Sequence, residues 1–297
     1  MALRTVYLLS LLLAVLKLAG YFASGSLIVL ASFFDSVTDA LISYLNYLFY
    51  RRARQKPDTE HPFGHGGFEV ISSLLQGVLI GLLALMVGNS AIRKILWGKN
   101  EDLSPEAFPW VIGIMIFSAL AGYMLQAILG RFERRLSDRQ EFSLTVKADR
   151  SHYMSDFWTN GLGAIGLISV VVFKEQRLDS LLALAAAGLL LRAAYPLLKH
   201  SLQHIMQSGA EPEVQRTIVE IALNCDPEVQ GIHRLRTRHL GPSLFIDFHL
   251  KLPAAISLHR AHDIGDAVEA AVLARFPQAD VLVHLDPDDI PDEDDLV

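Results

Sequence analysis

Cysteine is almost absent from this chain: among 297 residues the sequence holds one, Cys225. A single thiol excludes an internal disulfide and any zinc site built from several cysteines, and we expect Cys225 to be a small buried residue on a helix. Charged residues are also scarce, at 20% of the chain, and acidic residues outnumber basic ones, so the net charge is −6. This acidic balance excludes nucleic acid as the main partner.

Long apolar runs are what the chain has instead of charge. Hydrophobic residues make up 52% of it and the mean hydropathy is +0.33, which fits a membrane domain joined to a soluble one. A helix of about 20 apolar residues crosses a bilayer, and the sequence predicts six such helices. They are Leu3–Ala23, Ser26–Tyr50, Val70–Leu96, Trp110–Arg131, Leu144–Phe173 and Leu178–Leu198. No cleavage pattern separates the first run from the second, so we expect the first run to be retained.

Basic residues gather on one side of these runs. Clusters that include Arg51 and Arg52 follow the second run, and clusters that include Arg134 and Arg135 follow the fourth. Loops rich in Lys and Arg stay in the cytoplasm. The sequence therefore predicts a multi-pass protein of the inner (plasma) membrane whose N- and C-termini are both cytoplasmic.

After the sixth run the apolar stretches shorten and the charge rises. We predict a six-helix transmembrane domain over residues 1–208, a cytoplasmic metal-binding domain over 209–290 and an acidic tail over 291–297. Amphipathic and alternating patterns in the cytoplasmic domain predict the order αββαβ. Its elements are expected at Pro212–Asn224, Val229–Arg238, Leu244–Leu252, Ser257–Phe276 and Asp280–His284. The fold class is thus an α-helical membrane protein with a small α+β domain.

Two short polar segments interrupt the apolar runs. Each places two metal-binding side chains at positions i and i+4, on one face of a helix. This membrane quartet consists of Asp35, Asp39, His152 and Asp156. An ionisable residue at mid-membrane costs roughly 2.5–3.5 kcal/mol on insertion scales, so it is a functional candidate that needs a partner. Three carboxylates and one imidazole suffice for one tetrahedral divalent cation. Because metal ions and protons compete for such ligands, the quartet predicts the exchange of a metal ion for protons.

Two further sets of ligands lie outside the apolar runs. The loop triad, Asp58, His61 and His65, follows the second run, and its short spacing allows closure on one ion, with a solvated polar loop as the other interpretation. The C-terminal cluster is scattered over the strands and the second helix of the cytoplasmic domain. Its members are His233, His249, His262, His284 and Asp286. Together they suggest a metal cluster, provided that the fold brings them together.

These motifs jointly resemble the cation diffusion facilitator family, and within it the bacterial zinc/iron efflux type, over nearly the whole chain. The motifs that carry the resemblance are Asp35-x-x-x-Asp39, His152-x-x-x-Asp156, His61-Pro-Phe-Gly-His65-Gly, Leu235-Arg-Thr-Arg238, Phe245-Ile-Asp-Phe-His249 and His284-Leu-Asp-Pro287. The resemblance implies a homodimer with six membrane helices per subunit and a metallochaperone-like cytoplasmic domain. It also implies export of a divalent metal from the cytoplasm in exchange for protons, by alternating access.

The resemblance assigns a role to each ligand set. The membrane quartet would be the transport site, the loop triad a second site, and the C-terminal cluster a two-metal site that steadies the dimer. The mixture of Asp and His resembles carriers of Zn²⁺ or Fe²⁺ that also pass Cd²⁺, whereas an Asp in place of His152 is typical of Mn²⁺ carriers. Gly67 and Gln207 depart from the pattern, since relatives of this type often carry a Lys and an Asp near these places that pair across the dimer.

Two other functions stay open on the residues alone. A membrane-bound metal sensor or assembly scaffold would bind metal in the cytoplasmic domain without transport, but it has no need for a complete membrane quartet. An intramembrane metalloenzyme needs an open position on the metal and a general base nearby. Four ligands that fill the metal's positions, and a sequence without a His-Glu-x-x-His motif, favour a transporter over an enzyme.

Overall fold

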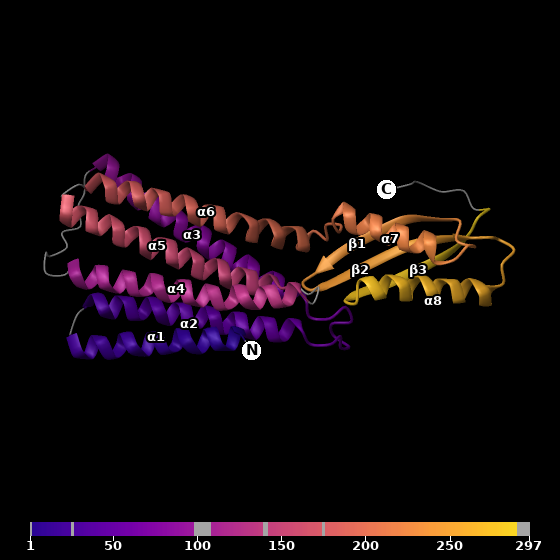
Figure 1. Cartoon of the computed structure of the whole chain (residues 1–297), viewed down its shortest axis with the longest axis horizontal. Coiled ribbons are helices and arrows are strands. Elements are labelled where there is room, and N and C mark those ends of the chain that lie inside the picture. The colour runs from indigo at the N-terminus through magenta and orange to yellow at the C-terminus, as the bar shows by residue number, and fades with distance from the viewer. Residues whose placement is uncertain (1, 25–26, 98–107, 139–141, 174–175, 290–297) are drawn as a thin grey trace. The chain divides into compact units, whose positions relative to one another are not determined.

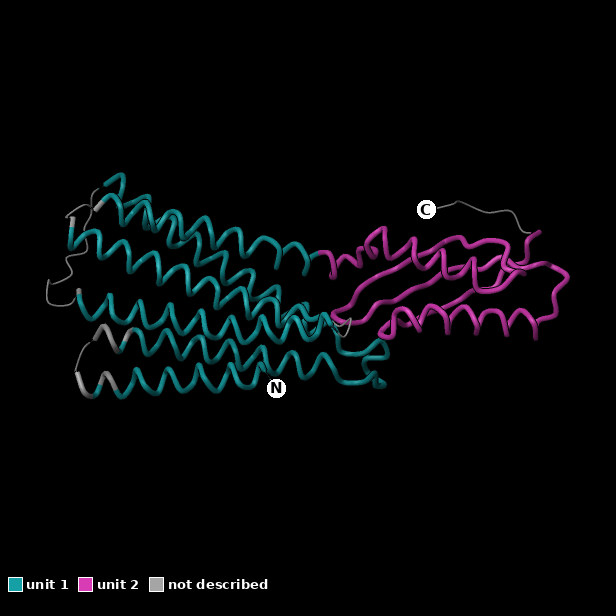
Figure 2. Tube along the Cα trace, in the orientation of Figure 1, with its two compact units in different colours: residues 1–202 teal, residues 203–297 magenta. Residues whose placement is uncertain are grey.

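The computed structural model describes residues 2–24, 27–97, 108–138, 142–173 and 176–289. The chain divides into two compact units, residues 1–202 and 203–297 (Figure 2), and each is described by itself. The predicted acidic tail over 291–297 lies outside the described residues.

Six long helices, lying side by side, make up the first unit in the part of the chain that the structure describes (Figure 1). They are α1 (Ala2–Ser24), α2 (Leu27–Ala53), α3 (Gly67–Trp97), α4 (Phe108–Ser137), α5 (Leu144–Phe173) and α6 (Gln176–Ile205). Within the residues that the structure describes in full, five helices are long and apolar enough to cross a membrane. The polar side chains of Asp35, Asp39 and Asn46 lie on α2.

Glycines allow close approach of helices at two crossings in this bundle. A Cβ atom at Gly77 of α3 would lie 3.0 Å from the side chain of Leu198 on α6, and one at Gly122 of α4 would lie 3.0 Å from the backbone oxygen of Tyr153 on α5. Small residues are the usual means of helix association in membranes, where apolar burial gives no driving force between helices. The crossing at Gly122 also brings α4 against Asp156, whose Cβ would be 3.6 Å away.

The second unit has the predicted αββαβ order. Its elements are α7 (Pro212–Cys225), β1 (Gly231–Leu240), β2 (Ser243–Leu252), α8 (Leu258–Arg275) and β3 (Ala279–Pro287). The strands form one sheet in the order β1-β2-β3, in which β2 is antiparallel to β1 and parallel to β3.

Alternation along β2 separates the two faces of this sheet. Phe248 and Leu250 are buried in one core with Ile218 of α7 and Ile264 of α8, so both helices cover the same face. Because successive side chains of a strand point to opposite faces, His249 lies on the other face. The fold therefore leaves a sheet face on which polar ligands can gather.

Candidate metal sites

Two helices that are distant in sequence bring three members of the membrane quartet together. α2 and α5 contact each other in the bundle. Nε2 of His152 lies 3.4 Å from Oδ1 of Asp39 and 3.7 Å from Oδ2 of Asp156. Ligand atoms of these three residues all lie within 4.8 Å of one another, and their side chains are 14–25% exposed. One divalent cation can contact all three after a small adjustment of the side chains.

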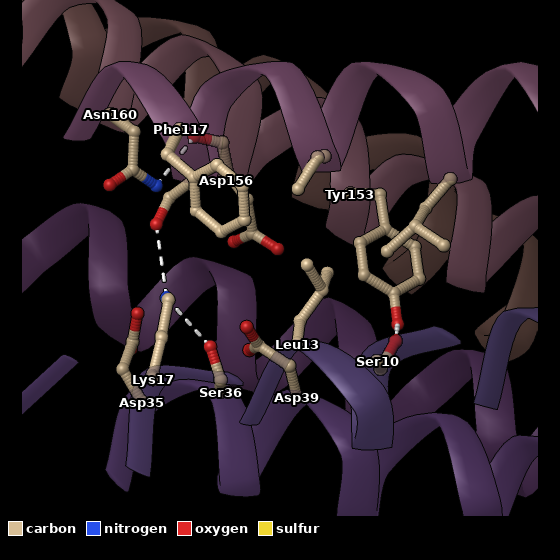
Figure 3. A pocket seen from close by; sticks show the side chains of 14 residues that line it. Ser10, Leu13, Lys17, Asp35, Ser36, Asp39, Phe117, Tyr153, Asp156 and Asn160 are labelled. Atoms are coloured by element: carbon tan, nitrogen blue, oxygen red, sulfur yellow. Dashed lines mark hydrogen bonds between the residues drawn. The ribbon is translucent and has the colours of Figure 1, made fainter. Parts of the chain in front are cut away.

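Asp35, the fourth member, lines the same cavity as Asp39 and Asp156 (Figure 3). Its carboxylate is not among the ligand atoms that lie within 4.8 Å of one another. The cavity measures about 30 Å³, more than the roughly 10–15 Å³ that one water molecule needs on this measure. A space of this size has room for a cation.

A buried hydrogen-bond network fixes α5 against α1 and α2 beside this cavity. Asp149 of α5 is 0% exposed and accepts hydrogen bonds from Ser43 at 3.2 Å and Asn46 at 2.8 Å, both on α2. The hydroxyl of Tyr153 lies 2.6 Å from the hydroxyls of Ser43 and of Ser10 on α1. A buried polar group is costly unless it is hydrogen-bonded. These contacts therefore fix the orientation of α5 about its own axis, with its metal-ligand side chains turned toward α2.

Sequence reasoning missed Asp149 and one basic residue at the site, Lys17. Lys17 of α1 is 9% exposed, and its Nζ donates to Ser36 of α2 at 2.7 Å and to Ser118 of α4 at 3.1 Å (Figure 3). Both missed residues are ionisable positions inside apolar runs, which is by itself a signal of function. Asp149 stands three residues before His152, on nearly the same face of the helix.

The loop between α2 and α3 brings the loop triad together. Oδ1 of Asp58 lies 3.3 Å from Nδ1 of His61, and its Oδ2 lies 3.3 Å from Nε2 of His65. Gly64 has φ of 83°, a conformation that glycine adopts without strain and that closes the turn. The backbone N–H of His61 donates to Asp58 at 2.7 Å and is the main cause that lowers the pKa of the Asp58 carboxyl. That carboxylate is therefore ionised in neutral solution and available to a cation.

Three histidines form a row across the sheet of the second unit. The strand register pairs His233 with His249, and His249 with His284, so the three lie on one face. Asp286 reaches His233 at 2.9 Å, His249 at 2.7 Å and His284 at 3.1 Å. Burial alone would raise the pKa of the Asp286 carboxyl, but hydrogen bonds with His249 and His233 outweigh it and lower that pKa. Ligand atoms of His233, His249 and Asp286 all lie within 4.8 Å of one another, and His284 is not in this group. Nitrogen and oxygen ligands at this spacing suit a zinc-like ion.

His262, the fifth member of the C-terminal cluster, is not brought to this row. It lies on α8, where its Nδ1 is 3.5 Å from Oδ1 of Asp266, and its side chain is 67% exposed. The helix α8 packs on the face of the sheet opposite the row. Within the described residues of one chain, His262 therefore lies apart from the other four members.

Known proteins match this chain along nearly its whole length. Residues 3–206 match the family model for the cation efflux transmembrane domain, and residues 210–288 match the model for the cytoplasmic domain of cation efflux proteins. The cation-efflux pump FieF of Pectobacterium carotovorum subsp. carotovorum (strain PC1) is 35% identical over 285 residues, which cover 94% of this chain and 89% of that pump. The cation-efflux pump FieF of Serratia proteamaculans (strain 568) is 34% identical over 286 residues, with coverages of 96% and 91%.

Among solved structures, one of the MamM CTD is 30% identical, covers 25% of this chain and 94% of that chain, and has a TM-score of 0.24. The two family models adjoin near residue 208, and the first of them alone covers more than half of the chain. Members of this family are membrane transporters and not enzymes. The apolar helical bundle, the ligands gathered inside it and these matches lead to one assignment: the chain belongs to the cation diffusion facilitator family of divalent cation efflux transporters.

Proposed function

We propose that this protein exports a divalent metal cation, Zn²⁺ above all, from the cytoplasm in exchange for protons by alternating access. The observation that carries the proposal is the meeting of Asp39, His152 and Asp156 between two helices of an apolar bundle. Asp35 lines the same cavity and supplies the fourth ligand. Four nitrogen and oxygen ligands complete a tetrahedral shell around Zn²⁺, so they can replace the hydration shell of the ion.

Competition for the same ligand atoms supplies the coupling to protons. A carboxylate or imidazole must be deprotonated to bind metal, so an arriving ion releases protons and arriving protons release the ion. When the cavity opens alternately to the two sides of the membrane, metal leaves on the side where protons enter. The protein then moves the two kinds of cation in opposite directions.

The ligand set also bears on which metal is carried. Imidazole suits Zn²⁺ and Fe²⁺, whereas carboxylates suit harder ions such as Mn²⁺. The mixed set therefore supports Zn²⁺ first, with Fe²⁺, Cd²⁺ and Mn²⁺ as further substrates. The named relatives are cation-efflux pumps, which agrees with export of such ions.

We further propose that both termini and the second unit are cytoplasmic and that two copies form a homodimer. The basic residues in the last turns of α2 and α4 support this orientation, as does the description of the second family model as a cytoplasmic domain. The exposed position of His262 supports a site completed by a second copy. The alternative of a metal-sensing scaffold accounts for the histidine row, but it leaves the buried ligands inside the bundle without a use.

Transport by purified protein in proteoliposomes tests this proposal. With a pH gradient across the membrane, we expect Zn²⁺ uptake that a fluorescent zinc indicator reports, and we expect Asp39→Ala and Asp156→Ala to abolish it. Asp179→Ala removes a carboxylate that pairs with Lys94 on another part of the bundle and should leave uptake largely intact.

Two results would contradict the proposal. Normal transport by both Asp39→Ala and Asp156→Ala would show that the ion takes another route. Zn²⁺ uptake that is indifferent to the pH gradient would refute proton coupling while leaving the metal site in place.

A further inference from the structure

A positively charged side chain, that of Lys17, lines the cavity of the membrane quartet. Lys17 is the basic side chain among the described residues that line it, and it is buried between α1, α2 and α4. An ammonium group offers three donors and no acceptor, and two of the three are used by Ser36 and Ser118. Figure 3 shows Lys17 reaching across the cavity beside Asp35. Two hydroxyls from different helices thus hold the ammonium in place.

The charge of the quartet does not balance without Lys17. Asp35, Asp39 and Asp156 carry three negative charges when all of them act as metal ligands, and a divalent ion supplies two positive ones. The Lys17 ammonium supplies the third, so the charged groups that line the cavity sum to zero when one divalent ion is bound. Asp149 lies outside this lining and accepts hydrogen bonds from Ser43 and Asn46. Neutrality matters because an unbalanced charge inside a bilayer is expensive.

Lys17 also lies at the boundary with a second, larger cavity. This cavity of about 460 Å³ is an open hollow on the surface of the bundle, lined by Lys17 together with Pro109, Trp110, Gly113, Ile114 and Phe117 of α4. Lys17 and Phe117 line both cavities. The larger cavity is almost entirely apolar in its lining and lies near the start of α4, at the end of the bundle opposite the loop triad. The ammonium therefore stands where the ligand cavity meets a space into which a long side chain can move.

We propose that Lys17 is a charge-matching and positioning residue of the transport site, which makes the site neutral when it holds one divalent cation and keeps that cation from binding too tightly to leave. This inference rests on the proposed transport function of the quartet. The ammonium repels the metal ion while it balances the carboxylates, so it weakens metal binding and speeds release. A site with the carboxylates alone would bind a divalent ion so tightly that its release would be slow.

Kinetics of Zn²⁺ uptake into proteoliposomes test this role at about pH 8, where few protons compete for the ligands. Even at a high effective dielectric, repulsion between an ammonium and a divalent ion a few ångströms apart amounts to more than about tenfold in binding. We therefore expect Lys17→Met to lower KM for Zn²⁺ by about tenfold or more and to lower kcat as well. Lys17→Gln keeps a hydrogen-bond donor without the charge and should behave in the same way.

Two variants serve as controls. Lys17→Arg keeps the charge, so its KM should stay closer to that of the native chain than to that of Lys17→Met. Lys94→Met removes a lysine that pairs with Asp179 elsewhere in the bundle, and it should change neither KM nor kcat. Elution as a single species on size-exclusion chromatography checks that each variant is folded.

A purely structural role for Lys17 predicts a different pattern. In that case kcat falls while KM stays unchanged or rises, and this result would overturn the inference. Native kinetics in Lys17→Gln would overturn it too, because hydrogen bonding rather than charge would then be the function of the side chain. Failure of the transport proposal is recognised separately, since Asp39→Ala would then transport like the native chain.

Discussion

Nε2 of His152 lies 3.4 Å from Oδ1 of Asp39, so an imidazole of α5 meets a carboxylate of α2 inside the bundle. This nitrogen atom is the softest ligand of the membrane quartet, in which the other members offer oxygen. The proportion of nitrogen to oxygen ligands decides which divalent ions a site prefers. The preference between metals should therefore depend on position 152 more than on any carboxylate of the quartet.

We expect His152→Asp to shift the preference from Zn²⁺ toward Mn²⁺. An all-carboxylate site suits Mn²⁺, so the ratio of kcat/KM for the two ions should move by about tenfold or more. Competition of Mn²⁺ with Zn²⁺ in a proteoliposome uptake assay measures the ratio. His259→Asp, at an 88% exposed position of α8, is the matched control and should not move it. An active His152→Asp variant with an unchanged ratio would contradict the assignment of His152 as a ligand.

The crossing of α4 and α5 should be sensitive to a single methyl group. A Cβ atom at Gly122 would lie 3.0 Å from the backbone oxygen of Tyr153, whereas a Cβ atom at Gly161 meets nothing within 4 Å. We expect Gly122→Ala to push the helices apart, at a cost of about 1–3 kcal/mol for overpacking, and to slow Zn²⁺ uptake. Gly161→Ala on α5 should transport normally and unfold at the same or a higher temperature, because alanine favours a helix by about 1 kcal/mol over glycine. Equal effects of the two substitutions on uptake would argue against a close crossing at Gly122.

The stability of the second unit should depend on pH in acid solution, because the ionised carboxylate of Asp226 contributes to it. The backbone N–H of Glu228 is the main cause that lowers the pKa of the Asp226 carboxyl, and Arg260, which donates to it at 2.8 Å, lowers the pKa further. A carboxyl whose pKa is lower in the folded chain stabilises the fold above its ordinary pKa of 3.8. This contribution is lost as the pH falls through the lowered value.

The measurement is hydrogen–deuterium exchange of α8 in the full chain, at a series of pH values from neutral to acid with intrinsic exchange rates corrected. Protection should be constant above the ordinary pKa of Asp226 and should fall below it, and Asp226→Asn should reduce protection at neutral pH and remove this part of the acid dependence. Asp263→Asn, at a half-exposed position of the same helix, is the control. An unaltered acid profile in Asp226→Asn would show that other carboxyls dominate.

The histidine row should affect assembly more than the choice of ion. His249 is the middle member and contacts Asp286 at 2.7 Å, so His249→Ala should weaken Zn²⁺ binding to the second unit and lower the stability of the proposed dimer. Light scattering across a dilution series, with and without Zn²⁺, measures the dimer. A shifted Zn²⁺/Cd²⁺ preference with unchanged dimerisation would contradict this role.

Local spacing was enough to predict the parts of the fold that depend on neighbours in sequence. Period and length identified the helices and strands, and the i, i+4 spacing placed His152 and Asp156 on one helical face. The strand alternation around His249 likewise placed that residue opposite the buried Phe248. These predictions succeed because one helix or one strand determines them.

The remaining features depend on how elements meet, which spacing does not determine. The register that puts His233, His249 and His284 in one row appears only when three strands pair. The position of His262 on the opposite side follows from the packing of α8. The role of Lys17 could be inferred only from its contacts with Ser36 and Ser118 on two other helices. The sequence alone does not show which groups a lone lysine in an apolar run will contact.

The contact between Lys17 and Ser36 also bears on how the chain enters a membrane during synthesis. Helix α2 carries two carboxylates, Asp35 and Asp39, inside its apolar run, and the imidazole of α5 that meets them is translated only after two further helices. Meanwhile α1 packs closely along α2 and carries an ammonium to it. We therefore expect the insertion machinery to receive α1 and α2 as one hairpin. In this hairpin the Lys17 ammonium compensates the charge of the carboxylates of α2 in the bilayer until the rest of the bundle is made.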